Sequence, residues 1–506
     1  MKTLSGLDGG FLSLETPETP MHVGSLQTFE VPKGQESRFY VGLKESVRER
    51  LPKVPAFSRR LAPMPLQFAN PVWIHEDRVD LDYHVQRIHL PEPGTHEQLF
   101  KLVAGLHAEL LDRAHPLWRI YVVDGLQGDE VGYYIKVHHA VIDGQAGMAL
   151  AELLFDTEPR ASRPRRGTAG AAPPGARPHA AERPGAGQLV AAAFRHDAAQ
   201  VAKLLRSLPD VARTLSGLMK ASGAKPPVAP AKAESRIALA PRTPLNVTIG
   251  TERDFAAVSI PLAEVKRIAA ASEAKVNDVV LATCSGALRR YLARHGELPR
   301  KSLMAAMPVS LRAAGNKEFT TQATMALVSL ASDIAHPLRR LRAIRDAAGR
   351  VKSTVGRAKS VIPTDFPTIG VPWVMHALAT LYGRSHIADV LPPVANVVIS
   401  NVPGPQFPLY AVGARMTGYW PLSIVEHGVG LNITLISYDG AVGYGLLAAR
   451  NAMPDVAVLA EEIRAAHEEL MEATRPKASV KRGAAGPRHP SKAGPTRTRG
   501  ASRAVK

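Results

Sequence analysis

The chain has 506 residues, a formal net charge of +18 and 45% hydrophobic residues. This length and composition are typical of a globular protein with two or three domains, and they exclude a fibrous or wholly disordered chain. The one cysteine, Cys284, excludes an intramolecular disulfide and is typical of a reducing cytoplasm. Because no apolar run reaches about 18 residues and the first residues lack a continuous apolar segment, we expect neither a membrane span nor a signal peptide.

The positive charge is concentrated in two segments. Thr157–Ala240 carries 14 Lys and Arg residues against 5 Asp and Glu, and Pro476–Lys506 carries 9 basic residues and no acidic one. The remaining chain holds 40 basic and 40 acidic residues and is therefore neutral. Because both segments are rich in Pro, Gly, Ala and Arg, we expect them to lie outside the folded cores. Such segments associate loosely with anionic surfaces, and we expect no specific nucleic-acid binding.

Hydrophobic periodicity predicts two α/β lobes. In the first, the strand-like LQTFEV precedes a polar helix over Glu36–Arg50, strands around Ile88 and Ile120, and a helix over His96–Ala114. The predicted domains are an N-terminal lobe over 1–156, a basic linker over 157–240, a C-terminal lobe over 241–475 and a disordered basic tail over 476–506.

The linker contains an apolar stripe. Between Val190 and Leu218, apolar residues recur at helical spacing, with Pro209 interrupting. Such a stripe either packs against a core or, with basic residues beside it, lies on a membrane surface. The surface-binding pattern is weakly developed, which favours packing.

In the second lobe, VVLATCSGALRRYLARH predicts a helix that Asn277 or Asp278 caps and that ends at Gly296. Its cysteine is expected to be a buried, unreactive thiol. KSLMAAMPVSL and ANVVIS predict strands. GLNITLISY and AVGYGLLA flank Asp439 and Gly440, which predicts a hairpin because both turn residues tolerate positive φ.

The stretch YYIKVHHAVIDG places two adjacent histidines before a turn. If Tyr133 to His139 is a strand, alternation puts His139 on the apolar face of Ile135 and Val137, and His138 on the other face. The two imidazoles then diverge, so we expect no metal site. Burial would keep His139 neutral and able to accept a proton near neutral pH. The alternative is a core histidine that bonds to backbone.

Asp143 and Gly144 follow the histidines on a sharp turn. Asp143 is expected to cap the next helix or to pin the turn by pairing with a distant arginine, for which Arg59 and Arg60 are candidates. Either arrangement would make the turn of the HHxxxDG motif rigid and so fix the orientation of one imidazole ring.

HHAVIDG resembles the HHxxxDG motif of CoA-dependent acyltransferases and peptide-synthetase condensation domains, whose second histidine is the general base. Further stretches between residues 3 and 447 resemble the bacterial bifunctional wax ester synthase/diacylglycerol acyltransferase family. These stretches are LSGLDGGFLSLETPETPMHVGSLQTFE, HPLWRIYVVDGL, VNDVVLA, MPVSLR, SNVPGP and GLNITLISYDG. The Pro/Arg-rich linker and the basic tail depart from the family pattern, which bears on localisation and not on chemistry.

The resemblance implies a chloramphenicol-acetyltransferase-like α/β fold, with two sandwich lobes and a tunnel between them. It also implies an O-acyltransferase in which His139 is the general base, His138 orients the loop and Asp143 holds it. The co-substrate would be acyl-CoA, with no metal or other cofactor. The acceptor would be diacylglycerol or a long-chain fatty alcohol, giving triacylglycerol or wax ester for lipid storage. The implied location is the cytoplasm, with peripheral association with the inner membrane or lipid droplets.

Several family positions carry two interpretations. Asn277 is either a helix cap or a donor that, with helix amides, stabilises an oxyanion. Trp118 and Arg119 either lock the start of a strand or contact substrate. Ser400 and Asn401 either form a turn or, by resemblance, contact the acyl group or CoA.

Two other functions remain open on the sequence. One is a condensation-type acyltransferase that takes acyl groups from carrier-protein thioesters, although no carrier or adenylation region is attached. The other is a non-catalytic lipid-binding or droplet-coating protein, in which His139 would be dispensable.

Overall fold

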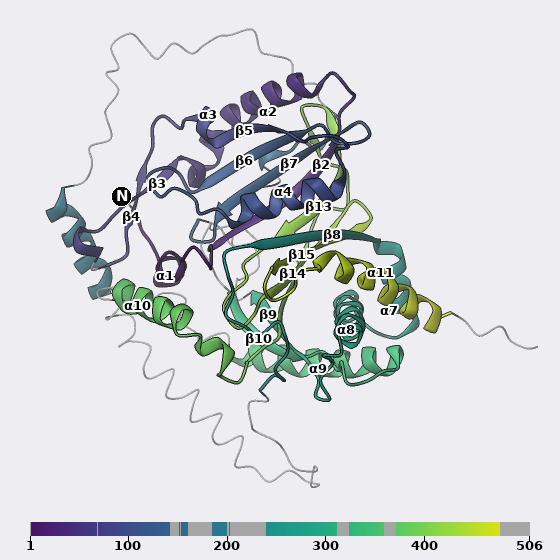
Figure 1. The fold of residues 1–506 in the computed structure, drawn as a ribbon. Coiled ribbons are helices and arrows are strands. Elements are labelled where there is room, and N and C mark those ends of the chain that lie inside the picture. Colours follow the sequence, from purple (N-terminus) through teal and green to yellow (C-terminus); the bar gives the residue numbers. More distant parts are fainter. Residues whose placement is uncertain are drawn as a thin grey trace, which may run out of the picture. The chain divides into compact units, whose positions relative to one another are not determined.

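Two six-stranded sheets carry the fold of the residues that the structure describes (Figure 1). The computed structural model describes 2–67, 69–141, 151, 153–159, 185–199, 202, 239–310, 323–358 and 371–475. Met1–Thr474 form one compact unit and Arg475–Lys506 a second, and every element below belongs to the first unit.

The first sheet has the order β12-β13-β2-β7-β6-β5. β5 and β6 pair in parallel, whereas the other neighbours pair antiparallel. Its strands are β2 (His22–Glu30), β5 (Val85–His89), β6 (Trp118–Asp124), β7 (Glu130–His138), β12 (Tyr410–Ala411) and β13 (Ala414–Leu422). By sequence, β12 and β13 belong to the second half of the chain, and the sequence did not predict that they join the first sheet.

Helices cover both faces of the first sheet. α2 (Glu36–Arg50), whose predicted bounds are confirmed, packs Phe39, Leu43 and Val47 into the core on one face. These side chains recur every four residues and so share one side of the helix. α4 (His96–Ala108) packs on the other face, in a core cluster that also contains Phe255 and Leu447 of the second sheet. α4 therefore lies between the two sheets.

The predicted helix from His96 to Ala114 is wrong at its C-terminal end, since α4 ends at Ala108. The reason is the buried Lys136 of β7, whose Nζ donates to the carbonyl oxygens of Leu106 at 2.6 Å and Glu109 at 2.7 Å. These bonds satisfy carbonyls that a longer helix would use. Burial lowers the pKa of Lys136 to about 8, so the ammonium is still charged at neutral pH.

The second sheet has the order β10-β9-β11-β14-β15-β8. One large apolar core packs against it and includes side chains of the four helices named at the end of this paragraph. The strands are β8 (Arg253–Pro261), β9 (Met304–Ser310), β10 (Ala323–Ser329), β11 (Val397–Pro403), β14 (Leu431–Tyr438) and β15 (Ala441–Ala449). The helices are α7 (Leu262–Ala271), α8 (Val276–Arg294), α9 (Pro337–Ala358) and α11 (Val456–Ala473).

Local predictions for the second lobe hold with one correction. The N-cap position of α8 is Lys275, whose side chain makes no capping bond, and the predicted cap at Asn277 is wrong. Asp278 accepts from the Lys275 N–H at 2.9 Å, from inside the first turn. The helix ends before Gly296, which has φ +73°, as predicted. The Asp439–Gly440 hairpin is confirmed by positive φ at both residues. The thiol in α8 is buried, which raises its pKa to about 12.

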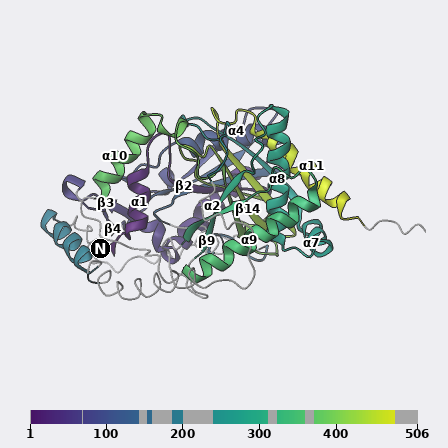
Figure 2. The same cartoon turned by 90° about the horizontal axis from the view of Figure 1, so that it is seen from below.

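A smaller sheet, β1 (Lys2–Thr3), β4 (Val72–His75) and β3 (Arg59–Ala62), lies beside α1 (Gly6–Leu14) and α10 (Val371–Arg384) (Figures 1 and 2). Helical residues 186–199 of the predicted linker pack Leu189 and Ala193 into a small cluster with this sheet. The predicted stripe itself does not pack there, because Val190 is only half-buried and Phe194 is 58% exposed. The buried residues lie one position earlier, and the rest of the stripe lies outside the described residues. Among those residues, no helix combines the length and apolarity needed to cross a bilayer.

Two glycines of β15 allow the sheets to meet. A Cβ atom added at Gly445 would overlap the carbonyl oxygen of Pro421, and one at Gly443 would overlap that of Tyr419. Both carbonyls belong to β13 of the first sheet. Since a backbone oxygen cannot rotate away as a side chain can, any residue with a Cβ atom would push the sheets apart.

We expect Gly445→Ala to lower the free energy of unfolding by about 1–3 kcal/mol, the usual cost of overpacking. The control is Gly105→Ala in the exposed middle of α4, where no atom lies within 4 Å of the added Cβ atom. That change should raise the free energy of unfolding by about 0.5–1 kcal/mol, because alanine favours the helix. Urea denaturation followed by circular dichroism measures both. Equal stability of Gly445→Ala and wild type would contradict the close sheet contact.

Candidate functional site

β7 ends at the first of the two adjacent histidines. Tyr133, Ile135 and Val137 face one core and Tyr134 faces the other, so the predicted alternation is confirmed. The strand itself stops at His138, one residue earlier than expected. His139 lies in the following turn, half-buried rather than buried, and its backbone N–H donates to the Met21 carbonyl at 2.8 Å.

His138 is buried and held by two contacts. Its Nδ1 accepts from the Ala140 N–H at 3.0 Å, and its Nε2 lies 3.2 Å from Glu15 Oε1. Because Nδ1 acts as an acceptor, the ring proton of the neutral imidazole is on Nε2, facing the carboxylate. His138 therefore ties the turn that carries His139 to Glu15.

Glu15 is a buried carboxylate, with a side chain only 2% exposed. Oε2 accepts from Arg113 Nη2 at 2.8 Å, and Oε1 accepts from the Met21 N–H at 3.2 Å. Burial acts to raise the pKa of Glu15, but the contacts with His138 and Arg113 outweigh it and lower the pKa to about 2. Glu15 thus carries a fixed negative charge at neutral pH. Sequence analysis missed it, because its partners lie about 100 residues away.

α1 also contacts the second histidine. The ring of Phe11 stacks on the ring of His139, with centroids 4.0 Å apart and planes 19° apart. Glu15 directly follows this helix. One short helix therefore positions both imidazoles, His139 by stacking and His138 through the carboxylate. The sequence predicted neither this helix nor its contacts with the histidines.

His22 lies beside the carboxylate, and His107 lies beside His22. His22 Nδ1 is 4.0 Å from Glu15 Oε1, and His22 Nε2 is 2.6 Å from the His107 carbonyl oxygen, to which it donates. His107 Nδ1 is 2.7 Å from the Tyr134 hydroxyl. Burial is the main cause that lowers the pKa of His22 to about 3 and that of His107 well below its usual value. Both are neutral, so neither competes as a cation for the carboxylate.

The remaining residues of the motif, Asp143 and Gly144, lie outside the described residues, and their roles stay predictions. Of the two arginines considered as partners of Asp143, Arg60 donates from Nε to Glu76 Oε2 at 2.6 Å. Arg60 is therefore engaged by another carboxylate.

Trp118 and Arg119 make structural contacts at the start of β6. Trp118 is fully buried. Its ring stacks on the rings of Phe57 and His84, with centroids 4.4 and 4.1 Å away. Its indole N–H donates to the Phe57 carbonyl at 3.0 Å. The Arg119 guanidinium lies 3.9 Å from the centroid of the Tyr83 ring. These contacts favour the interpretation as a strand lock, and substrate contact stays a prediction.

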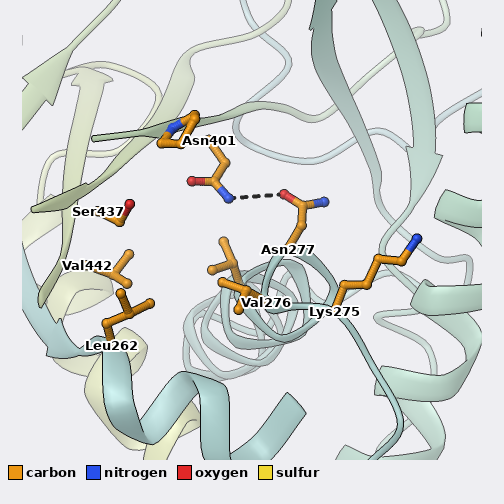
Figure 3. Close-up of a pocket in the computed structure, with 9 residues that line it drawn as sticks. Leu262, Lys275, Val276, Asn277, Asn401, Ser437 and Val442 are labelled. Atoms are coloured by element: carbon orange, nitrogen blue, oxygen red, sulfur yellow. Dashed lines mark hydrogen bonds between the residues drawn. The ribbon is translucent and has the colours of Figure 1, made fainter. Parts of the chain in front are cut away.

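The structure brings Asn277 and Asn401 together at a pocket of the second lobe (Figure 3). Asn277 lies in the first turn of α8, and its Oδ1 accepts from Asn401 Nδ2 of β11 at 3.2 Å. The pocket has a volume of about 350 Å³. Besides the two asparagines, its lining has five apolar side chains, the cationic Lys275 and Ser437. Ser400 is half-buried and pairs with Thr434 in the strand register. Asn277 is thus neither a cap nor isolated, since Asn401 orients its amide.

Known proteins match almost the whole chain. The family model of the wax ester synthase/diacylglycerol acyltransferase catalytic domain matches residues 4–280, and that of the C-terminal domain matches 320–471. A putative diacylglycerol O-acyltransferase of Mycobacterium tuberculosis is 34% identical over 93% of this chain and 90% of its own. The O-acyltransferase WSD of Acinetobacter baylyi is 34% identical over 90% of this chain and 93% of its own.

Solved structures agree with the predicted fold class. The wax ester synthase/diacylglycerol acyltransferase from Marinobacter aquaeolei superposes with a TM-score of 0.65 at 30% identity, over 94% of this chain and 100% of that chain. A condensation domain of the calcium-dependent antibiotic synthetase superposes with a TM-score of 0.53 at 17% identity, which shows a shared fold alone. The chain therefore belongs to the wax ester synthase/diacylglycerol acyltransferase family.

Proposed function

We propose that this acyltransferase moves the acyl group of acyl-CoA to the hydroxyl of diacylglycerol or of a long-chain fatty alcohol. The products are triacylglycerol or wax ester, and free CoA. Family membership supports the reaction class. The observation that carries the proposal for this chain is the histidine pair at the end of β7, in which a buried carboxylate holds one imidazole and the other reaches a half-buried turn.

His139 acts as the general base. It takes the proton of the acceptor hydroxyl as that oxygen attacks the thioester carbonyl, and a C–O bond forms. When the tetrahedral intermediate collapses, the C–S bond breaks, and the imidazolium returns its proton to the CoA thiolate. The proton is conserved over the cycle. No acyl-enzyme, metal or other cofactor takes part in these steps, and a tunnel between the lobes would admit the two substrates from opposite sides.

His138 and Glu15 are positioning residues in this mechanism. The Glu15 carboxylate fixes the His138 ring, and His138 Nδ1 fixes the backbone of Ala140 just beyond the base. Phe11 fixes the plane of the His139 ring by stacking. A general base needs such restraint, because a misplacement of about 1 Å costs as much as 10²-fold in rate.

For the oxyanion we propose Asn277, whose carboxamide oxygen is already used by Asn401. With its oxygen accepting that bond, both N–H groups of Asn277 remain as donors, and the amides at the start of α8 add to them. Ser400 and Asn401 would contact the acyl group or the CoA arm from β11.

We also propose a cytoplasmic location with peripheral association with the inner membrane or lipid droplets. The Pro476–Lys506 tail supports this, because it carries 9 basic residues and no acidic one. Such a segment contributes electrostatic attraction to anionic lipid headgroups that salt weakens.

His139→Ala should abolish ester synthesis, because general-base removal usually costs about 10² to 10⁴ in rate. Pure protein is incubated with palmitoyl-CoA plus hexadecanol or diacylglycerol, and CoA release and ester are measured. Circular dichroism and binding of acyl-CoA show that the variant stays folded. Near-normal turnover of folded His139→Ala would overturn the mechanism. Transfer only from a carrier-protein thioester would instead favour the condensation-type reaction.

Glu15→Gln should lower kcat by about 10- to 10²-fold and leave KM for acyl-CoA unchanged, because it misplaces the base without touching the donor. If Glu15 acts through His138, the double variant with His138→Ala should cost no more than His138→Ala alone. A purely structural role would lower the amount of folded enzyme and would not produce this non-additivity.

The same variant has a pH signature in stability. The folded-state pKa of Glu15, about 2, is below its unfolded value, so its stabilisation is complete above about pH 4.5 and is lost as pH falls toward 2. The difference in free energy of unfolding between wild type and Glu15→Gln should therefore be constant above about pH 4.5 and decrease as the pH falls toward 2. A difference that is constant down to pH 2 would show that the carboxylate charge is irrelevant.

Asn277→Ala should lower turnover by about 10²-fold or more if its amide stabilises the oxyanion. Asn401→Ala, which frees that amide from its orienting partner, should lower turnover less and in the same direction. Melting temperatures of both variants provide the control. Unchanged turnover with a lowered melting temperature would limit the asparagine pair to stability.

A further inference from the structure

α10 presents an apolar face to solvent. Among the described residues, 14 large apolar side chains are exposed, and half of them fall within residues 373–394, which marks this region as a surface with a partner. Those on the helix are Trp373, Val374, Leu378 and Leu381, each more than half exposed. With the exposed Ala377 between them, they form what is here termed the α10 face.

The spacing of these residues makes the face continuous. Positions 373, 374, 377, 378 and 381 lie on one side of an α-helix with about 3.6 residues per turn. The other side packs on the protein, where α10 contacts α1 and where Gly383 lies beside His427. The Trp373 indole N–H donates to the Leu66 carbonyl at 3.0 Å, which joins the exposed Leu66 to the face.

The charge around the face matches an anionic partner. α10 contains no Asp or Glu and ends in the exposed Arg384. The excess positive charge of the chain lies in the linker and the tail, so around the face itself only Arg384 and the absence of acidic residues on α10 count. An apolar helix face with a tryptophan at one end and a basic residue at the other fits the boundary between acyl chains and headgroups.

The face also lies close to the candidate active site. α10 packs against α1, and Phe11 of α1 stacks on His139 (Figures 1 and 2). Only one short helix therefore separates the apolar face from the catalytic imidazole. An acceptor that dissolves in a membrane and not in water would enter from this side.

We propose that the α10 face docks on an anionic phospholipid membrane and presents the α1 side of the active site to acceptors in that membrane. The docking is inferred from the exposed residues of α10 alone. The delivery of acceptor rests on the acyltransferase function proposed above. The tail attracts the chain over a longer range, and the α10 face makes the apolar contact that salt does not screen.

The test compares two valines of equal exposure. Val374 on α10 and Val41 on α2 are both 58% exposed, so Val374→Glu and Val41→Glu add the same charge on different helices. Full-length protein is floated with vesicles of phosphatidylglycerol and phosphatidylethanolamine at about 0.5 M NaCl, where tail attraction is screened. Val374→Glu should lower the bound fraction by about tenfold, as expected for removing one apolar side chain from an apolar phase, and Val41→Glu should leave it unchanged.

Three outcomes would overturn the docking. The first is failure of wild type to float at high salt, and the second is equal binding of the two variants. In the third, wild type is a dimer that Val374→Glu, but not Val41→Glu, converts to monomers in gel filtration, so that a second copy covers the face.

A second assay separates delivery from chemistry. With hexadecanol dispersed in detergent and no vesicles, all three proteins should have equal turnover. Inactivity of all three would count against the acyltransferase function proposed above and would leave the flotation result intact. With diacylglycerol embedded in vesicles, Val374→Glu should be about tenfold slower, in proportion to its lost binding. Equal rates on embedded diacylglycerol would overturn the delivery role.

Discussion

The two sheets depend on one another through β13. This strand comes from the second half of the chain but pairs with β2 of the first sheet, from Met416 opposite Phe29 to Leu422 opposite Gly24. β15 of the second sheet packs so closely against β13 that Gly443 and Gly445 of β15 stand where a side chain would overlap the backbone of β13. Without β13, β2 would be an unpaired edge strand, which proteins avoid. Residues 1–156 therefore do not complete their sheet alone.

The candidate site also depends on the pairing of β13 with β2. β2 lies between β13 and β7 in the sheet. Met21, the residue just before β2, binds both parts of the site. Its carbonyl accepts from the His139 N–H, and its N–H donates to Glu15. Pairing of β13 with β2 fixes the position of Met21. Met21 in turn fixes the turn that carries His139 and the carboxylate of Glu15. A residue in the second half of the chain can thus alter the site without touching it.

Local sequence patterns predicted the elements well and their partners poorly. α2, the end of α8 at Gly296 and the Asp439–Gly440 hairpin depend on neighbours in the chain, and each was predicted. The end of α4 depends on Lys136, a residue on another strand, and was predicted wrongly. For the same reason His139 was found from its motif, whereas Phe11 and Glu15 were missed. Periodicity carries no information about which distant groups meet.

α1 links the fixed and the adaptable parts of the site. At its C-terminal end, Glu15 is a buried charge paired with His138 and Arg113, and moving it away from them would leave that charge unpaired in the interior, which is costly. On its outer side the same helix packs against α10, none of whose side chains is fully buried. The carboxylate end therefore resists displacement, which keeps the turn of His139 in place. α10 has no such buried anchor, so the docking proposed for its outer face would act on half-buried contacts and not on the charge pair.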